Sequence, residues 1–233
     1  MTVDLQVVDD PARACAALLV GAAASGDDIV LTGGSTPRTA YQEFVDAVRA
    51  VDVDISDARF WFGDERCVEP DDKRSNYRLA QETIFGPLSD RVTVEVHRMK
   101  GEMGPHAGAD DYEAQLLEAG RPEFDLLLLG IGPDGHTASL FPDQATLDER
   151  SRLIVPVPEA GLEPFVPRIS FTFAAIALAK KVVVLASGDT KAEAVAAAFG
   201  RGAEPNRHVP ASLLPESARE LTVILDRPAA GRL

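Results

Sequence analysis

The chain has 233 residues, of which 45% are hydrophobic, so it is long enough to bury a sizeable core. Its formal net charge is −14, which argues against binding to nucleic acid or to an anionic membrane surface, because both need clustered Lys and Arg. Two isolated cysteines, Cys15 and Cys67, argue against a disulfide framework, and no apolar run reaches the roughly 18–20 residues that a membrane span needs.

Apolar periodicity and turn residues predict strands that alternate with helices. Strands are predicted at 3–8, 28–32, 59–62, 92–97, 124–131, 153–157, 168–173, 181–186 and 221–225, and helices end near residues 24, 50, 85, 118 and 199. This alternation favours an α/β fold, a mostly parallel sheet covered by helices on both faces in a Rossmann-like open sandwich. No repeat, low-complexity tract or linker divides the chain, so we expect a single domain over residues 1–233.

A glycine turn follows the strand at 28–32. It contains Gly33, Gly34, Ser35 and Thr36 and leads into a helix. Free backbone N–H groups and the positive end of a helix suit a phosphate group, but the same residues also make an ordinary capped helix after a tight turn. The GxxxxGK[ST] spacing of a P-loop is absent.

A second polar loop, at 63–66, follows the strand at 59–62. Arg66 stands there beside two carboxylates, Asp64 and Glu65. Its guanidinium could clamp a phosphate with two parallel hydrogen bonds, or it could pair with these neighbours.

Two further cations occupy unusual positions later in the chain. Arg168 begins the strand at 168–173 and could bind an anion or pair with a neighbour. Lys191 lies in the first turn of a helix, where a cation opposes the helix dipole. An anion between Lys191 and the helix would remove this conflict, although a lysine that points into water is an equally simple interpretation.

The clearest signal for chemistry lies at the end of a buried strand. Residues 126–131 are apolar apart from one glycine, which is typical of a central parallel strand. Three glycines between 130 and 135 let the backbone turn sharply, and Asp134 and His136 lie in and after this turn. His136 could be a structural histidine, but this position favours a base, since an unperturbed imidazole has a pKa of roughly 6.5.

Four loops, at 33–37, 63–66, 130–136 and 187–191, follow strands. Because the carboxyl ends of parallel strands meet at one edge of the sheet, we expect their polar residues to share one ligand site. The spacing of the glycines at 130–135 formally matches a dinucleotide fingerprint, but Pro142 cuts short the helix that should follow. No HxH, HExxH or CxxC pattern supports a metal, and no GxSxG elbow supports a serine hydrolase.

Five stretches, in this order and spacing, resemble the 6-phosphogluconolactonase family: LTGGSTP, FWFGDER, LLLLGIGPDGHTASLFP, RISFT and ASGDTKAEAV, within residues 31–195. The resemblance implies hydrolysis of 6-phospho-D-glucono-1,5-lactone to 6-phosphogluconate, without a cofactor or metal. It also implies that His136 activates water and that Asp134 orients the imidazole or holds a sugar hydroxyl. The phosphate and sugar would be held by Gly33, Gly34, Ser35, Thr36, Asp64, Arg66, Arg168 and Lys191.

Two alternatives remain at this point. Glucosamine-6-phosphate deaminase is similar, but its loop typically reads DGHIAFNEP, with a glutamate where this chain has Phe141, and MDEY in place of GDER. A non-catalytic sugar-phosphate sensor would not need His136. The acidic N-terminus lacks a secretory leader pattern, so we expect a cytoplasmic protein. A small sugar phosphate is the expected partner, with no nucleic acid or membrane, and a monomer is the default expectation.

Overall fold

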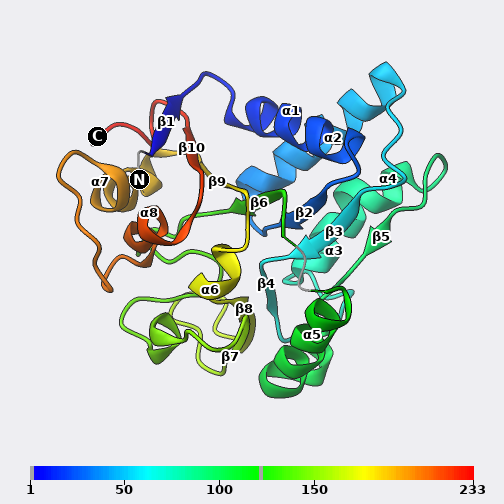
Figure 1. The fold of residues 1–233 in the computed structure, drawn as a ribbon. Helices are drawn as coiled ribbons and strands as arrows, with labels where there is room; N and C mark the ends of the chain where they lie inside the picture. Colours follow the sequence, from blue (N-terminus) through cyan, green and yellow to red (C-terminus); the bar gives the residue numbers. More distant parts are fainter. Residues whose placement is uncertain (1–2, 121–122) are drawn as a thin grey trace.

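The computed structural model describes residues 3–120 and 123–233. Seven strands form one sheet in the order β1-β10-β9-β6-β2-β3-β5, and all its neighbouring pairs run parallel (Figure 1). They are β1 (Asp4–Val7), β2 (Asp28–Leu31), β3 (Arg59–Phe62), β5 (Glu95–Val96), β6 (Leu126–Leu129), β9 (Lys181–Ala186) and β10 (Leu221–Leu225). The predicted parallel sheet is confirmed, and the leucine-rich strand β6 is its middle member.

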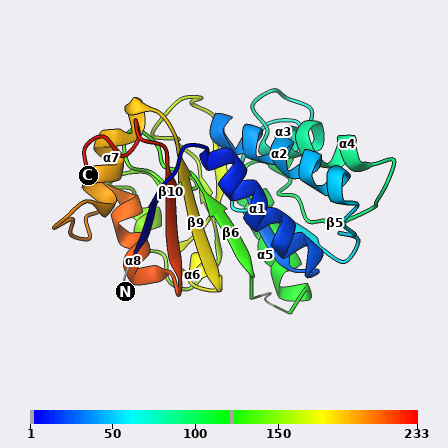
Figure 2. The same ribbon diagram turned by 90° about the horizontal axis from the view of Figure 1, so that it is seen from above.

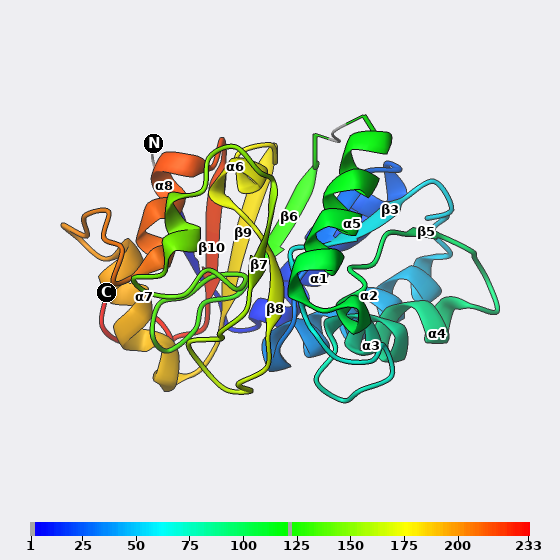
Figure 3. The ribbon, with the colours of Figure 1, turned by 90° about the horizontal axis from the view of Figure 1, so that it is seen from below.

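Helices cover both faces of this sheet. On one face, α1 (Pro11–Ala24) and α2 (Ser35–Val51) pack against each other (Figure 2). On the opposite face lie α5 (Pro105–Glu118) and α6 (Phe173–Ile176) (Figure 3). The other helical segments are short: α3 (Asn76–Ala80), the π-helical η1 (Gln81–Phe85), α4 (Gly86–Leu88), α7 (Ala192–Phe199), α8 (Leu214–Ser217) and the 3-10 turns η2 (Gly101–Met103), η3 (Ala145–Asp148), η4 (Asp189–Lys191) and η5 (Pro210–Leu213).

A second, smaller sheet lies beside α5 and was not predicted. It has the antiparallel order β4-β8-β7, with β4 (Asp64–Arg66), β8 (Arg168–Phe171) and β7 (Ile154–Val157) (Figure 3). The prediction of a loop at 63–66 is therefore wrong for its last three residues. The pairing that makes β4 a strand is non-local, because Arg66 lies opposite Arg168.

Two other elements differ from the sequence expectation. The strand predicted at 92–97 is reduced to Glu95–Val96, which pairs only with β3 at the edge of the sheet. The single helix predicted to end at Phe85 is instead α3 followed by the π-helical η1 and then α4. The widened turn forms because the N–H of Gly86 donates to the carbonyl of Gln81, five residues earlier.

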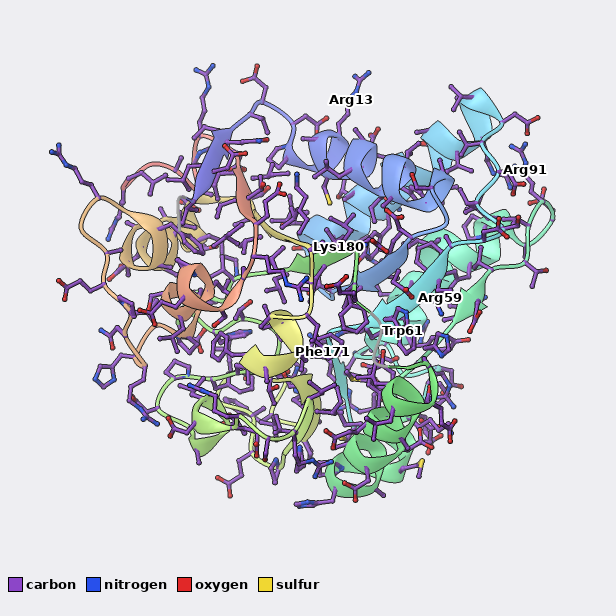
Figure 4. All side chains as sticks on the ribbon, viewed as in Figure 1. Arg13, Arg59, Trp61, Arg91, Phe171 and Lys180 are labelled. Carbon is purple, nitrogen blue, oxygen red and sulfur yellow. The ribbon has the colours of Figure 1, made fainter. Side chains whose placement is uncertain are left out.

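The core lies between the two layers of helices. All residues of β2, β6 and β10 are buried, which agrees with strands covered on both faces. Figure 4 shows Trp61 and Phe171 in the interior, whereas Arg13 and Arg91 lie at the periphery. Burial of each such large apolar side chain contributes about 1.5–3 kcal/mol to the free energy of unfolding.

The strand order places a topological switch point between β2 and β6. From β2 the chain moves to β3 and β5 on one side, whereas from β6 it moves to β9 and β10 on the other. The loops that leave β2 and β6 therefore diverge at neighbouring strand ends. In open α/β sheets, ligands bind in the crevice that this divergence leaves at the carboxyl ends.

Candidate active site

One cavity of about 200 Å³ opens at this switch point. It brings together residues that follow β2, β6 and β9, residues of β4, and residues that precede or begin β8. The lining residues are Thr32, Gly33, Gly34, Asp64, Arg66, Gly130, Ile131, Gly132, Pro133, His136, Ala138, Phe141, Leu162, Glu163, Arg168 and Lys191. The expectation that the polar residues of the four loops share one hollow is met by Asp64, Arg66, His136 and Lys191, whereas Asp134 is not among the lining residues. Arg168 joins them from the small sheet.

The loop after β6 is shaped by its glycines. The N–H of Gly132 donates to the carbonyl of His136 at 2.9 Å, and the N–H of Gly135 donates to the carbonyl of Gly132 at 3.0 Å. A Cβ atom on Gly132 would lie 2.1 Å from Nδ1 of His136 and 2.4 Å from Oδ1 of Asp134. Glycine is therefore required at 132, because the side chains of Asp134 and His136 fold back over it. The sequence analysis predicted that Pro142 would cut short a helix after this loop. The structure agrees, because residues 137–140 form an isolated bridge between Thr137 and Leu140.

Asp134 and His136 form a hydrogen-bonded pair. Nδ1 of His136 lies 2.6 Å from Oδ1 of Asp134, and the imidazole side chain is 20% exposed. A carboxylate accepts but does not donate, so it favours the tautomer in which Nδ1 carries the proton and Nε2 keeps its lone pair. Burial raises the pKa of Asp134, but the hydrogen bonds from His136 outweigh burial and leave that pKa below its ordinary value.

Arg66 and Arg168 form the cationic wall of the cavity and face each other across β4 and β8. Nη1 of Arg66 donates to the carbonyl of Arg74 at 2.5 Å. Its Nε is buried and has no hydrogen-bond partner within the part of the chain that the structure describes. A buried N–H without a partner is costly, so a bound anion would remove that penalty.

Arg168 is more deeply placed, with 3% of its surface exposed. Its Nε donates to the carbonyl of Val166 at 3.0 Å and Nη2 to that of Pro164 at 2.7 Å. Burial lowers the pKa of Arg168, and the nearby Arg66 lowers it further, although an arginine stays charged at neutral pH. These bonds also fix the loop at 162–166, which explains why Leu162 and Glu163 reach the cavity although no chemical signal in the sequence marked them.

Lys191 reaches the cavity from η4, the turn that follows β9 and precedes α7. Burial lowers the pKa of its ammonium group, and the Asp134 carboxylate partly offsets this effect. The three cations Arg66, Arg168 and Lys191 thus gather in one hollow of a chain with a net charge of −14. Such a concentration of positive charge is suited to an anionic ligand.

The glycine turn after β2 divides between two hollows. Gly33 and Gly34 line the cavity, whereas Ser35 and Thr36 line a neighbouring hollow together with Ser187 and Gly188. The expectation that all four residues of the turn meet one ligand is therefore not matched by their placement. The turn itself is fixed by α2, because Oη of Tyr41 accepts from the N–H of Thr32 at 2.9 Å and donates to its carbonyl at 2.7 Å.

The acidic residues next to Arg66 are both engaged by the protein. Glu65 accepts hydrogen bonds from the backbone N–H groups of Arg66, Asn76 and Tyr77 and from the hydroxyl of Ser75. Burial raises the pKa of Glu65, and these hydrogen bonds oppose that rise without cancelling it. Asp64 accepts from Asn76 and from Ser139. Neither carboxylate forms an ion pair with the guanidinium of Arg66, so the Nε of that group stays available to a ligand.

The other histidines and the cysteines are placed differently. The ring of His97 stacks on that of Trp61, with 3.7 Å between the ring centroids. The exposed His208 forms a hydrogen bond with Asp143. Cys15 is buried in the core, and burial raises the pKa of the Cys67 thiol to about 12. Over residues 3–120 and 123–233, no group of three His, Cys, Asp or Glu side chains is arranged to hold a metal ion. In the same residues, no helix has the length and apolar character needed to cross a membrane.

The chain was compared with known proteins. The family described as "Glucosamine-6-phosphate isomerases/6-phosphogluconolactonase" matches residues 6–223. The 6-phosphogluconolactonase of Mycobacterium bovis is 36% identical over 242 aligned positions, which cover 99% of this chain and 95% of that protein. A solved structure of 6-phosphogluconolactonase from Trypanosoma brucei superposes with a TM-score of 0.83 at 26% identity, covering 100% and 99% of the two chains. A monomeric glucosamine-6-phosphate deaminase superposes with a TM-score of 0.81 at 21% identity, covering both chains fully, and so shares the fold.

Proposed function

Because the chain belongs to the glucosamine-6-phosphate isomerase/6-phosphogluconolactonase family, we infer that it is a 6-phosphogluconolactonase, an ester hydrolase that converts 6-phospho-D-glucono-1,5-lactone to 6-phospho-D-gluconate. One observation carries this inference for the cavity itself. His136, which is hydrogen-bonded to Asp134, shares the cavity wall with Arg66, Arg168 and Lys191. A base and a cluster of cations in one hollow are what the hydrolysis of a phosphorylated lactone needs.

His136 acts as the base in this proposal. Its Nε2 takes a proton from a water molecule whose oxygen attacks C1 of the lactone, and the carbonyl oxygen becomes an oxyanion. When the tetrahedral intermediate collapses, the bond from C1 to the ring oxygen breaks, and the protonated imidazole returns its proton to that oxygen. Asp134 keeps the proton on Nδ1 throughout and stabilises the imidazolium. No covalent intermediate is needed, because a lactone is already an activated ester.

The phosphoryl group is proposed to bind among the cations. Arg66 offers its unpartnered Nε, Lys191 offers an ammonium group, and the N–H groups of Gly33 and Gly34 lie at the start of α2. A dianion in this position would neutralise the positive charge that Arg66, Arg168 and Lys191 bring to the cavity. His136 and the three cations of the same copy meet in this cavity, so we propose that a single copy is catalytically competent.

The deaminase alternative is less favoured by the loop after β6. Where that enzyme carries a glutamate for ring opening, this chain has Phe141, which is buried with its ring 4.8 Å from that of His136. The sensor alternative is also less favoured, because a non-catalytic sensor would not need the hydrogen bond that sets the tautomer of His136.

Acid release from 6-phospho-D-glucono-1,5-lactone, followed at constant pH, tests the proposal. Purified protein is expected to accelerate it far above the spontaneous rate. Unphosphorylated D-glucono-1,5-lactone is expected to react with kcat/KM lower by about 10- to 100-fold, because a charge-assisted contact contributes about 1.5–3 kcal/mol. Acid release at only the spontaneous rate, or release of ammonia from glucosamine 6-phosphate, would contradict the assignment.

A further inference from the structure

Asp64 connects three separate segments around the cavity. It is the first residue of β4 and is 5% exposed. Oδ1 accepts a hydrogen bond from Nδ2 of Asn76 at 2.9 Å, and the same amide donates to the backbone carbonyl of Asp64. Oδ2 accepts from Oγ of Ser139 at 2.6 Å. One carboxylate therefore joins β4 to the start of α3 and to the loop that carries His136.

Ser139 is the member of this connection that lies closest to the catalytic base in sequence. It is three residues after His136 and has no exposed surface. Its N–H donates to Oγ of Ser170, the residue opposite Asp64 in the small sheet. The intervening Ala138 has a φ of +49°, a left-handed conformation that alanine rarely adopts by itself. The loop is thus held in this shape by contacts with β4 and β8, and not by local preference.

We propose that Asp64 is a positioning residue that fixes the His136 loop against the cationic wall through its hydrogen bond to Ser139. This proposal rests on the lactonase function proposed above. Both oxygens of Asp64 already accept hydrogen bonds from protein donors, and the donor on the loop side is buried out of reach of a ligand.

The hydrogen bond between Asp64 and Ser139 also sets the distance between the loop that carries His136 and the cations that bind the phosphoryl group. Asp64 and Arg66 belong to the same short strand, and Arg66 lies opposite Arg168. The bond from Asp64 to Ser139 therefore ties the imidazole loop to the strand that carries the cations. If it is lost, the loop is free to shift relative to the bound phosphoryl group, and a displacement of about 1 Å at a reacting centre lowers turnover by about 10²-fold.

The test compares Ser139→Ala, Asp64→Ala and the double variant in the acid-release assay. Each single variant is expected to lower kcat by about 10- to 100-fold while KM changes less than about twofold, because the cations still bind the phosphoryl group. The double variant is expected to be no slower than the slower single variant, since both substitutions break the same connection. Thr83→Val removes another buried hydroxyl, one that donates to the carbonyl of Leu79, and is the matched control with wild-type kcat.

Ser139→Cys keeps nearly the same volume with a weaker donor, so it is expected to fold and to give a kcat between those of wild type and Ser139→Ala. Wild-type kcat in Ser139→Ala, a raised KM in Asp64→Ala, or a double variant whose loss is the product of the single losses would overturn the proposal. If the wild-type protein itself shows no lactonase activity, the proposed function fails. Hydrogen exchange then still tests the connection, because Ser139→Ala must exchange the amides of residues 136–139 faster than wild type.

Discussion

Replacing His136 with alanine is expected to lower kcat for 6-phospho-D-glucono-1,5-lactone by about 10²- to 10⁴-fold, the usual contribution of a positioned general base. The variant lacks the imidazole, and with it the Nε2 nitrogen that accepts a proton from water. KM is expected to stay close to its wild-type value, because the cations that hold the phosphoryl group are untouched. Acid release at constant pH, corrected for spontaneous hydrolysis, gives both constants.

The matched control is His106→Ala. His106 lies in the first turn of α5 and is exposed, so its loss is expected to leave kcat and KM unchanged. A His136→Ala variant that folds, as judged by circular dichroism, and turns over as fast as wild type would show that His136 is not the base. A variant with raised KM and unchanged kcat would instead mean that the imidazole binds the substrate.

Replacing Asp134 with asparagine is expected to lower kcat by roughly 10²- to 10⁴-fold, although the shape of the residue hardly changes. Oδ1 of Asp134 lies 2.6 Å from Nδ1 of His136. An asparagine keeps an oxygen facing the backbone N–H and Nδ1 of His136, but it lacks the negative charge that stabilises the imidazolium formed when His136 takes a proton. Combining this substitution with His136→Ala is expected to cost nothing beyond His136→Ala alone.

The pH dependence follows from the same pair. Hydrogen bonds from His136 outweigh the effect of burial and hold the pKa of Asp134 below its ordinary value of 3.8, so the carboxylate stays ionised as the pH falls toward that value. The wild-type kcat profile is therefore expected to show no loss from protonation of Asp134 at neutral or mildly acidic pH. If the Asp134→Asn and His136→Ala losses multiply in the double variant, Asp134 acts on the substrate independently of the imidazole.

The sequence was informative wherever the signal is local. The leucines before Gly130 predicted the middle strand, and the glycine turn predicted that Asp134 and His136 emerge at its end. The loops that carry Arg66 and Lys191 were predicted to converge with the His136 loop, and all three residues do line one cavity. This succeeded because a parallel sheet places its loops by topology alone, whatever their detailed conformation.

Features that depend on pairing between distant segments were not predicted. The three residues of β4 have too little pattern to identify a strand, and they become one only by pairing with β8. The engagement of Asp64 with Ser139 likewise joins residues 75 positions apart. Glu163 reaches the cavity because Arg168 binds carbonyl groups of its loop. Ser35 and Thr36 are the first two residues of α2, and they line a neighbouring hollow.

The central claim is that one cavity holds the lactone end of the sugar at His136 and the phosphoryl end among the cations. A crystal structure with bound 6-phospho-D-gluconate tests it most directly. We expect the C1 carboxylate within hydrogen-bonding distance of Nε2 of His136 and the phosphoryl oxygens in contact with Lys191 and at least one of Arg66 and Arg168. A product molecule bound outside this cavity, or bound with its phosphoryl group against His136, would contradict the account.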